Sequence, residues 1–137
     1  MSRVRLSRVI EFSSSLRYER PDLSAEENRR LFGARASRHG HNFRLEVTLR
    51  GVPDPETGMV IDLKDLNDVL EREVMARFDH RDLNDDTAFF EKDPPTPENV
   101  ARVLFELLNE ALPPGLLDRL RLQPERDFWV DVVGGAG

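Results

Sequence analysis

A strict alternation of apolar and polar residues over Phe43–Arg50 constrains the fold more than any other feature of this sequence. The apolar positions are all odd-numbered: Phe43, Leu45, Val47 and Leu49. Because side chains along a strand point to alternate faces, this segment predicts a β-strand with one buried face and one polar face. Residues 4–12 alternate less regularly, and short strands are expected around Leu120–Leu122 and Phe128–Val133.

Two helices are expected between these strands. Apolar residues recur at helical spacing over Leu63–Phe78, directly after Asp62 as an N-cap. A second apolar stripe covers Pro97–Ala111 and follows Thr96, a second capping residue. The order strand–strand–helix–helix–strand–strand predicts an α+β fold, with an antiparallel four-stranded sheet and both helices on one of its faces.

The segment between the first two strands, residues 13–38, is polar, with one short helix expected over Ala25–Leu31. It is long for a structureless loop, and such loops are usually functional. Its arginines allow two interpretations, a solvated surface or a patch that gathers phosphate. They are Arg17, Arg20, Arg29, Arg30, Arg35 and Arg38.

Composition narrows the classes of function. The chain has 137 residues, a formal net charge of −6 and no cysteine. Its length predicts one domain over residues 1–137, and the missing cysteine excludes disulfides, thiolate nucleophiles and Cys-ligated zinc. The negative charge argues against nucleic-acid binding. Since no apolar run is long enough for a membrane span or a signal peptide, a cytoplasmic protein is expected.

Three short motifs contain residues able to carry chemistry. His39 and His41 flank a glycine at the start of a strand, so both point to one face and suit joint metal binding; the alternative is a pair of exposed loop histidines. Asp79 next to His80 suits an acid–base pair, but a helix C-terminus also accounts for both residues. Thr96 caps a helix whose N-terminus is able to bind a carbonyl or an anion.

Together these motifs resemble the 6-pyruvoyltetrahydropterin synthase family, which includes the 6-carboxytetrahydropterin synthases. The matching segments are Phe12–Ser15, Leu31–Gly33, His39–Phe43, Gly58–Asp62, Asp79–His80 with Leu83–Asn84, and Thr96–Asn99. The resemblance implies the tunnelling fold, in which the sheets of several subunits join into a barrel, usually a hexamer with active sites between subunits. It also implies a zinc-dependent lyase reaction on a pterin such as dihydroneopterin triphosphate.

The resemblance assigns roles to individual residues. His39 and His41 correspond to two of the three histidines that bind zinc in the family. Asp79 and His80 correspond to its acid–base pair. Thr96 corresponds to a contact with the pterin.

Three positions depart from the family pattern. Leu16 stands where the third zinc-binding histidine belongs, and Arg35 stands in place of the catalytic cysteine. The glutamate that anchors the pterin is replaced by Pro124, with Glu125 one residue further on. A one-residue offset turns a side chain to the opposite face of a strand unless a bulge intervenes. Arg35 is unable to act as a general base but is able to hold a phosphate or carboxylate through two hydrogen bonds.

These departures lead to two hypotheses from different classes. The first is a pterin lyase with a degenerate active site, in which Asp79 and His80 act as catalytic residues and Arg35, Thr96 and Glu125 contact the substrate. The second is a non-catalytic pterin- or purine-binding protein that has kept the fold. Both predict a homo-oligomer, because the chain has few apolar residues and exposed sheet edges favour pairing with further copies.

Overall fold

A long antiparallel pair of strands forms the centre of the computed structural model, which describes residues 2–134. β1 (Val4–Leu16) and β2 (His39–Gly51) pair along their whole length, from Val4 opposite Gly51 to Leu16 opposite His39. β1 is longer than predicted because three consecutive serines, which give no apolar alternation, continue it. His39 and His41 therefore lie within a strand, and the alternative of two loop histidines is wrong.

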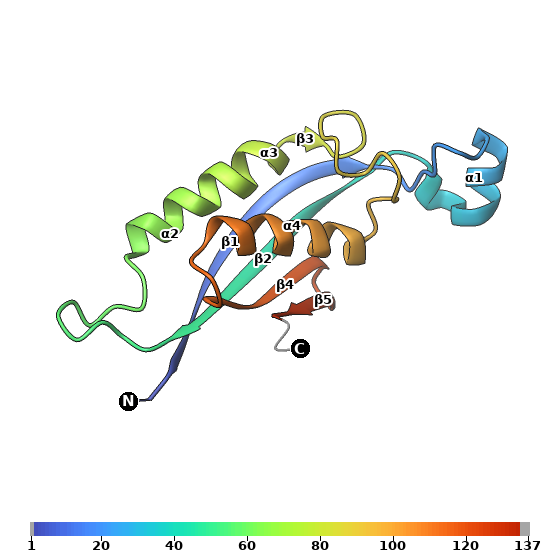
Figure 1. Cartoon of the computed structure of the whole chain (residues 1–137). Helices are drawn as coiled ribbons and strands as arrows, with labels where there is room; N and C mark the ends of the chain where they lie inside the picture. The colour runs from blue at the N-terminus through green and yellow to red at the C-terminus, as the bar shows by residue number, and fades with distance from the viewer. Residues whose placement is uncertain (1, 135–137) are drawn as a thin grey trace.

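The sheet has five strands in the order β3-β1-β2-β4-β5 (Figure 1). β4 (Leu117–Glu125) pairs with β2, and β5 (Phe128–Val133) forms a hairpin with β4, as the sequence predicts apart from the greater length of β4. The additional strand is β3 (Arg81–Asp82), which runs parallel to the end of β1. The prediction of four strands missed it, because two residues are too few to show an alternation.

The segment before β2 forms a small helical unit. α1 (Ala25–Phe32) begins at Ser24, whose side chain forms a capping box with Glu27, and η1 (Gly33–Ala36) leads into β2. Figure 1 shows this unit at one end of the long strands, away from the other helices. The short helix predicted over Ala25–Leu31 is confirmed.

The remaining helices lie on one face of the sheet (Figure 1). α2 (Leu63–Leu70), a π-helical turn η2 (Glu71–Met75) and α3 (Ala76–Phe78) follow one another without a break. Asp62 caps the first of them, and Thr96 caps α4 (Pro97–Ala111), so both predicted helices are confirmed. The sequence does not predict the π-helical turn, because the helical spacing of the apolar residues shows no break there. None of the helices in the described part of the chain is long and apolar enough to cross a membrane.

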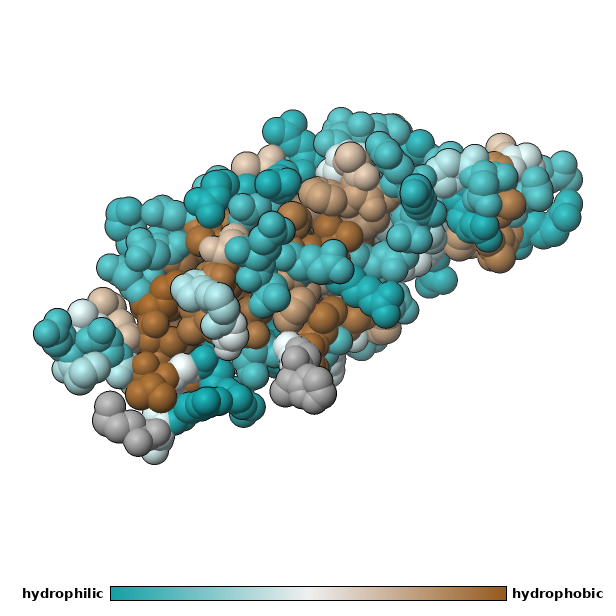
Figure 2. Space-filling model, in the orientation of Figure 1, coloured by the Kyte–Doolittle hydropathy of each residue, from teal (hydrophilic) through white to brown (hydrophobic). Residues whose placement is uncertain are grey.

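The two faces of the sheet differ in character. The core lies between the sheet and the helices; among its fully buried side chains are Phe12, Phe43, Leu45, Val74, Phe78 and Leu104. Figure 2 shows hydrophobic residues between helices whose outer surfaces are mainly hydrophilic. The other face carries polar pairs such as Ser7 with Thr48 and Arg121 with Asp131. Because β-strand side chains alternate, one strand pair supplies both the core and this polar face.

Candidate functional site

His39 and His41 begin β2 and point to the same face of the sheet, as their spacing predicts. Their ring centroids lie 5.3 Å apart and the rings are nearly perpendicular. His39 Nδ1 lies 2.9 Å from the carbonyl oxygen of Ser37. When this nitrogen carries the proton and donates it to that carbonyl, Nε2 keeps its lone pair for a ligand.

The pKa of His41 is lowered. Burial disfavours the charged imidazolium, and the neighbouring His39 acts in the same direction. Glu125 and a hydrogen bond to the backbone of Pro124 oppose these effects. His41 is therefore chiefly neutral at neutral pH, the form in which an imidazole accepts a hydrogen bond or binds a metal.

Aromatic rings hold both histidines in place. Tyr18 packs on His39 with ring centroids 5.6 Å apart, and Phe43 packs on His41 at 5.4 Å. Phe43 in turn stacks on Phe12 at 5.0 Å, in the core. The histidines thus extend a packed row of rings, so their orientation is fixed without a ligand.

Leu16 occupies the position where the resemblance implies a third zinc-binding histidine. It lies directly opposite His39 in the pairing of β1 with β2, and it is 1% exposed within the core. No group of three histidine, aspartate or glutamate side chains in residues 2–134 is placed to hold a metal ion. Because zinc sites ordinarily have at least three protein ligands, this set of donors does not fit the zinc centre that the resemblance implies.

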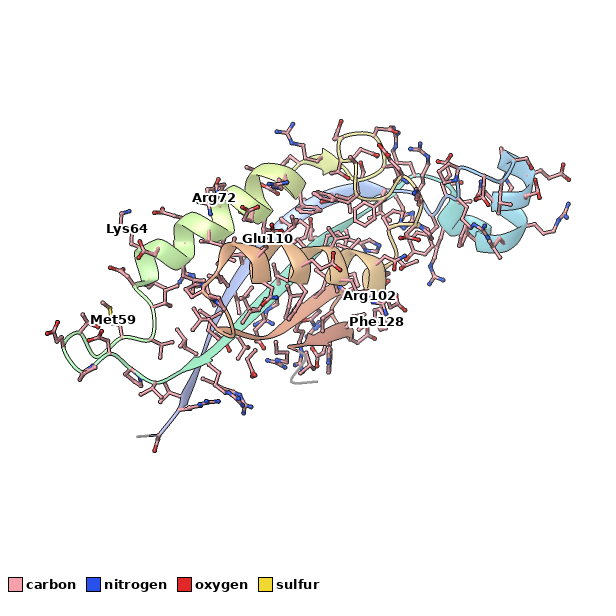
Figure 3. All side chains as sticks on the ribbon, viewed as in Figure 1. Met59, Lys64, Arg72, Arg102, Glu110 and Phe128 are labelled. Atoms are coloured by element: carbon pink, nitrogen blue, oxygen red, sulfur yellow. The ribbon has the colours of Figure 1, made fainter. Side chains whose placement is uncertain are left out.

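A cavity of about 460 Å³ opens beside the two histidines, and we call it the histidine pocket. It lies between the start of β2, η1, the N-terminus of α4 and the turn that joins β4 to β5. Phe128 lies at the start of β5, on the side of the N-terminal half of α4 (Figure 3). The lining residues used below are Tyr18, Arg35, His39, His41, Glu125 and Phe128. Four of the residues proposed from the sequence therefore meet in one cavity.

Glu125 reaches this pocket because of a bulge. The register between β4 and β5 shifts between Leu122, which is opposite Val130, and Glu125, which is opposite Phe128. Glu125 stands one residue beyond the position of the family's anchoring glutamate, and in a regular strand this offset turns a side chain to the opposite face. The additional residue on β4 compensates for the offset, so Glu125 faces the pocket. Pro124 is buried, and both Pro124 and Glu125 line the pocket, but only Glu125 brings a carboxylate to it.

Arg35 differs from most of the neighbouring arginines. Four of them form ion pairs with carboxylates: Arg17, Arg20, Arg30 and Arg38. Arg35 forms no ion pair with any residue of the described chain, although its backbone carbonyl accepts a hydrogen bond of 2.8 Å from Tyr18 N. Of the two interpretations of the six arginines, these ion pairs favour the solvated surface for the four, because their charges already have partners.

Asp79 and His80 form the predicted pair in a turn, residues 79–86, that is tied to β1. Asp79 Oδ2 lies 2.9 Å from His80 Nδ1, and its other oxygen accepts a 2.9 Å hydrogen bond from Ser13 N. The hydrogen bond from Ser13, together with His80, lowers the pKa of Asp79, although partial burial opposes the shift. His80 has a positive φ of 57°, and its side chain is 83% exposed. A carboxylate therefore orients an accessible imidazole.

This pair opens into a different cavity. His80 lines a groove of about 590 Å³ together with residues of β1, β2 and β3, among them Asn42 and Asp82. His41 borders both cavities, but no hydrogen bond or ion pair within residues 2–134 joins Asp79 or His80 to His39 or His41. The structure thus divides the predicted site into two parts.

Thr96 acts mainly as a helix cap. Its hydroxyl oxygen accepts a hydrogen bond of 3.2 Å from Asn99 N, and the next residue, Pro97, lines the histidine pocket. Thr96 itself is not among the lining residues. It is placed at the rim of the pocket, with its hydroxyl already in use.

The sequence analysis missed two aromatic residues of the pocket, Tyr18 and Phe128. Tyr18 follows Leu16 at the end of β1, and burial raises the pKa of its phenol, which keeps it protonated. One indication in the sequence that Tyr18 belongs to the site was its position two residues after Leu16, opposite the histidine motif.

Comparisons with known proteins identify the family to which this fold and sequence are similar. A family model described as 6-pyruvoyl tetrahydropterin synthase matches residues 5–133. The 6-pyruvoyl tetrahydrobiopterin synthase of Pongo abelii is 41% identical over 119 residues, which cover 85% of this chain and 82% of that protein. The dihydroneopterin monophosphate aldolase of Pyrococcus furiosus is 36% identical over 95 residues, 69% of this chain and 76% of that protein. The solved structure of Caenorhabditis elegans 6-pyruvoyl tetrahydropterin synthase has a TM-score of 0.91 and 35% identity, and covers 98% of each chain.

Proposed function

The chain belongs to the 6-pyruvoyl tetrahydropterin synthase family, and from that premise we propose that its histidine pocket binds a pterin such as dihydroneopterin triphosphate. The observation that carries this proposal is the bulge that brings Glu125 beside His39 and His41. The names of the relatives differ in the pterin on which they act, so the compound class is proposed and the exact substrate is left open.

The lining of the pocket suits a flat, nitrogen-rich ring. Tyr18 and Phe128 provide aromatic surface on which a ring is able to stack. The Glu125 carboxylate accepts hydrogen bonds only, and it matches the amino and ring N–H groups along one edge of a pterin. Bonds of this kind, with one charged partner, are stronger than bonds between neutral groups.

Any chemical step requires a group that exchanges protons near neutral pH. Arg35 keeps its charge and is excluded from this role. His80, oriented by Asp79, is the remaining histidine, and it is accessible. We propose that this pair acts on a ligand held in the histidine pocket of a neighbouring copy of the chain.

Both edges of the sheet are suited to such an assembly. β5 lies at one edge, and β3 covers only the Ser14–Ser15 part of β1 at the other. Unpaired strand edges favour the addition of further strands. The proposed assembly is a homo-oligomer built through these edges, and the resemblance points to a hexamer.

A non-catalytic pterin- or purine-binding protein is the second candidate. Leu16 and Arg35 favour it, because they remove a metal ligand and the usual proton carrier but leave the lining of the pocket intact. No step proposed here passes through zinc, since the donors present do not fit a three-ligand centre.

Binding of neopterin, followed by its fluorescence, tests the proposal. We expect saturable binding that Glu125→Gln weakens about tenfold, the effect of losing a charge-assisted hydrogen bond. Glu106→Gln is the matched control, since Glu106 is exposed on α4 and does not line the pocket. Its affinity is expected to stay within about twofold of wild type. No saturable binding, or equal affinity for the Glu125→Gln variant, would contradict the proposal.

A further inference from the structure

The histidine pocket is lined by charged side chains of both signs that are not joined to each other in ion pairs. Arg35 and Glu125 both line it, yet neither forms an ion pair with any residue in the described part of the chain. Both act electrostatically on Tyr18 and His41, in opposite directions. One cation, Arg35 of η1, therefore faces the same cavity as two carboxylates, Glu125 at the end of β4 and Asp127 in the β4–β5 turn.

Two arginines close to Arg35 in the chain differ from it, because both form ion pairs. Arg17 and Arg38 lie on either side of the pocket segment, and each pairs with Asp85, at 3.2 Å and 2.9 Å. Arg38 also pairs with Asp82 at 3.1 Å. Arg17 and Arg38 thus have carboxylate partners, whereas Arg35, which lines the pocket, has none among the described residues.

We infer that the pocket takes a dipolar ligand whose anionic oxygens are held by Arg35, without a metal ion, while its N–H donors face Glu125. This inference rests on the proposed function and deepens it, because it assigns the orientation of the ligand and the group that binds its charged end. The ligand class is a nitrogen heterocycle with a phosphate or carboxylate tail.

The chemistry of the side chains supports this orientation. A guanidinium presents N–H donors in a planar fork that matches two oxygens of a phosphate or carboxylate. Arg35 belongs to η1, whose backbone is joined to the segment after β1 by the hydrogen bond that Tyr18 N donates to the Arg35 carbonyl. In contrast, a metal-held anion needs a third protein ligand, and at that position Leu16 is buried in the core.

Calorimetric titration of the intact chain with tripolyphosphate and, separately, with citrate, both in excess EDTA, tests the inference. We expect at least one of these anions to bind, and the identity of the binder distinguishes a phosphate tail from a carboxylate tail. Arg35→Met is expected to weaken this binding by about 10- to 100-fold, as for the loss of a bidentate charged pair. Arg35→Lys is expected to recover only part of the affinity, since an ammonium group lacks the planar fork.

Arg29→Met provides the matched control. Arg29 is exposed, lies on α1, lines a separate cavity and also forms no ion pair in residues 2–134, so its loss changes net charge equally. Its variant is expected to bind within about twofold of wild type. Equal losses in the Arg29 and Arg35 variants would show general electrostatics and overturn the inference.

Two further outcomes also overturn it: neither anion binds, or binding appears only when zinc replaces EDTA. Neopterin, which carries no phosphate, separates these failures from a failure of the proposed function. If neopterin still binds in a Glu125-dependent manner, the pterin site stands and only the role of Arg35 fails. Loss of neopterin binding as well removes the proposed function itself.

Discussion

The 79–86 turn and the histidine pocket use polar groups in opposite ways. In the turn, Asp79 is bonded to Ser13, Asn84 to both backbone groups of Arg17, and Asp82 to Ser15. In the pocket, Arg35 and Glu125 form no ion pair with described residues. Internal contacts therefore hold the turn in place, whereas Arg35 and Glu125 lack such partners, as the proposed ligand site requires.

Arg38 connects the two regions. It directly precedes His39 in the chain, and its guanidinium pairs with Asp82 and Asp85 of the turn. These ion pairs join the start of β2 to β3 and the residues after it, and one of the carboxylates, Asp82, also lines the groove beside His80. The following predictions test this division between a rigid turn and an open pocket, beginning with the largest effect.

The first prediction concerns turnover. If the chain is a lyase, dihydroneopterin triphosphate is converted slowly, and His80→Ala lowers that rate by about 100-fold or more, the usual contribution of a general acid or base. Steady-state kinetics measure the effect, with the exposed Arg81→Ala as the neighbouring control. Fast wild-type turnover that is insensitive to His80→Ala would contradict the assignment.

The second prediction concerns Leu16. Because this side chain is buried opposite His39, Leu16→Ala is expected to lower the free energy of unfolding by about 2–5 kcal/mol. Arg35→Ala, in the same cavity region, is expected to change it by less than about 0.5 kcal/mol, since its side chain is exposed. Urea unfolding of both variants measures the contrast, and equal losses would show that Arg35 is structural.

The third prediction separates the carboxylates of the two regions. Asp82 accepts hydrogen bonds from Ser15 Oγ, Asn84 N and Asp85 N, so Asp82→Ala is expected to cost about 1–3 kcal/mol of stability. Asp127→Ala, at the pocket, is expected to cost less than about 0.5 kcal/mol. Thermal and urea unfolding measure both, and a larger loss for Asp127 would reverse the comparison.

The fourth and smallest effect depends on pH. The folded pKa of Asp79 is lowered, so its ionised form stabilises the fold above the ordinary aspartate pKa of about 4. That stability is lost as the pH falls from about 4 through the lowered folded value. Asp79→Asn is expected to make the fall in unfolding free energy between pH 7 and pH 3 shallower. An unchanged profile would mean that the carboxylate contributes nothing to the turn.

The sequence predicted the parts of the fold that rest on periodicity. The alternation over residues 43–50 and the helical stripes after Asp62 and Thr96 all correspond to observed elements. It missed β3 and the end of β1, where serines and a two-residue strand are held by partners distant in the sequence. Short-range patterns contain no information about such partners.

The candidate site was predictable as a set of residues but not as an arrangement. The spacing of His39 and His41 predicted their shared face, whereas the side on which Glu125 lies depends on a bulge that the sequence does not mark. The resemblance to the family singles out Arg35 by its position, but its place in the histidine pocket and its lack of a carboxylate partner are visible only in the folded chain. The separation of His80 from the histidine pocket required the folded chain.

Equilibrium binding of dihydroneopterin triphosphate to the metal-free chain tests the central claim most directly, since this ligand combines a pterin edge with an anionic tail. The account predicts saturable binding in EDTA that Arg35→Met and Glu125→Gln each weaken by about tenfold or more, while Arg29→Met stays within about twofold of wild type. Binding that requires added zinc, or that is unchanged by both pocket substitutions, would contradict it.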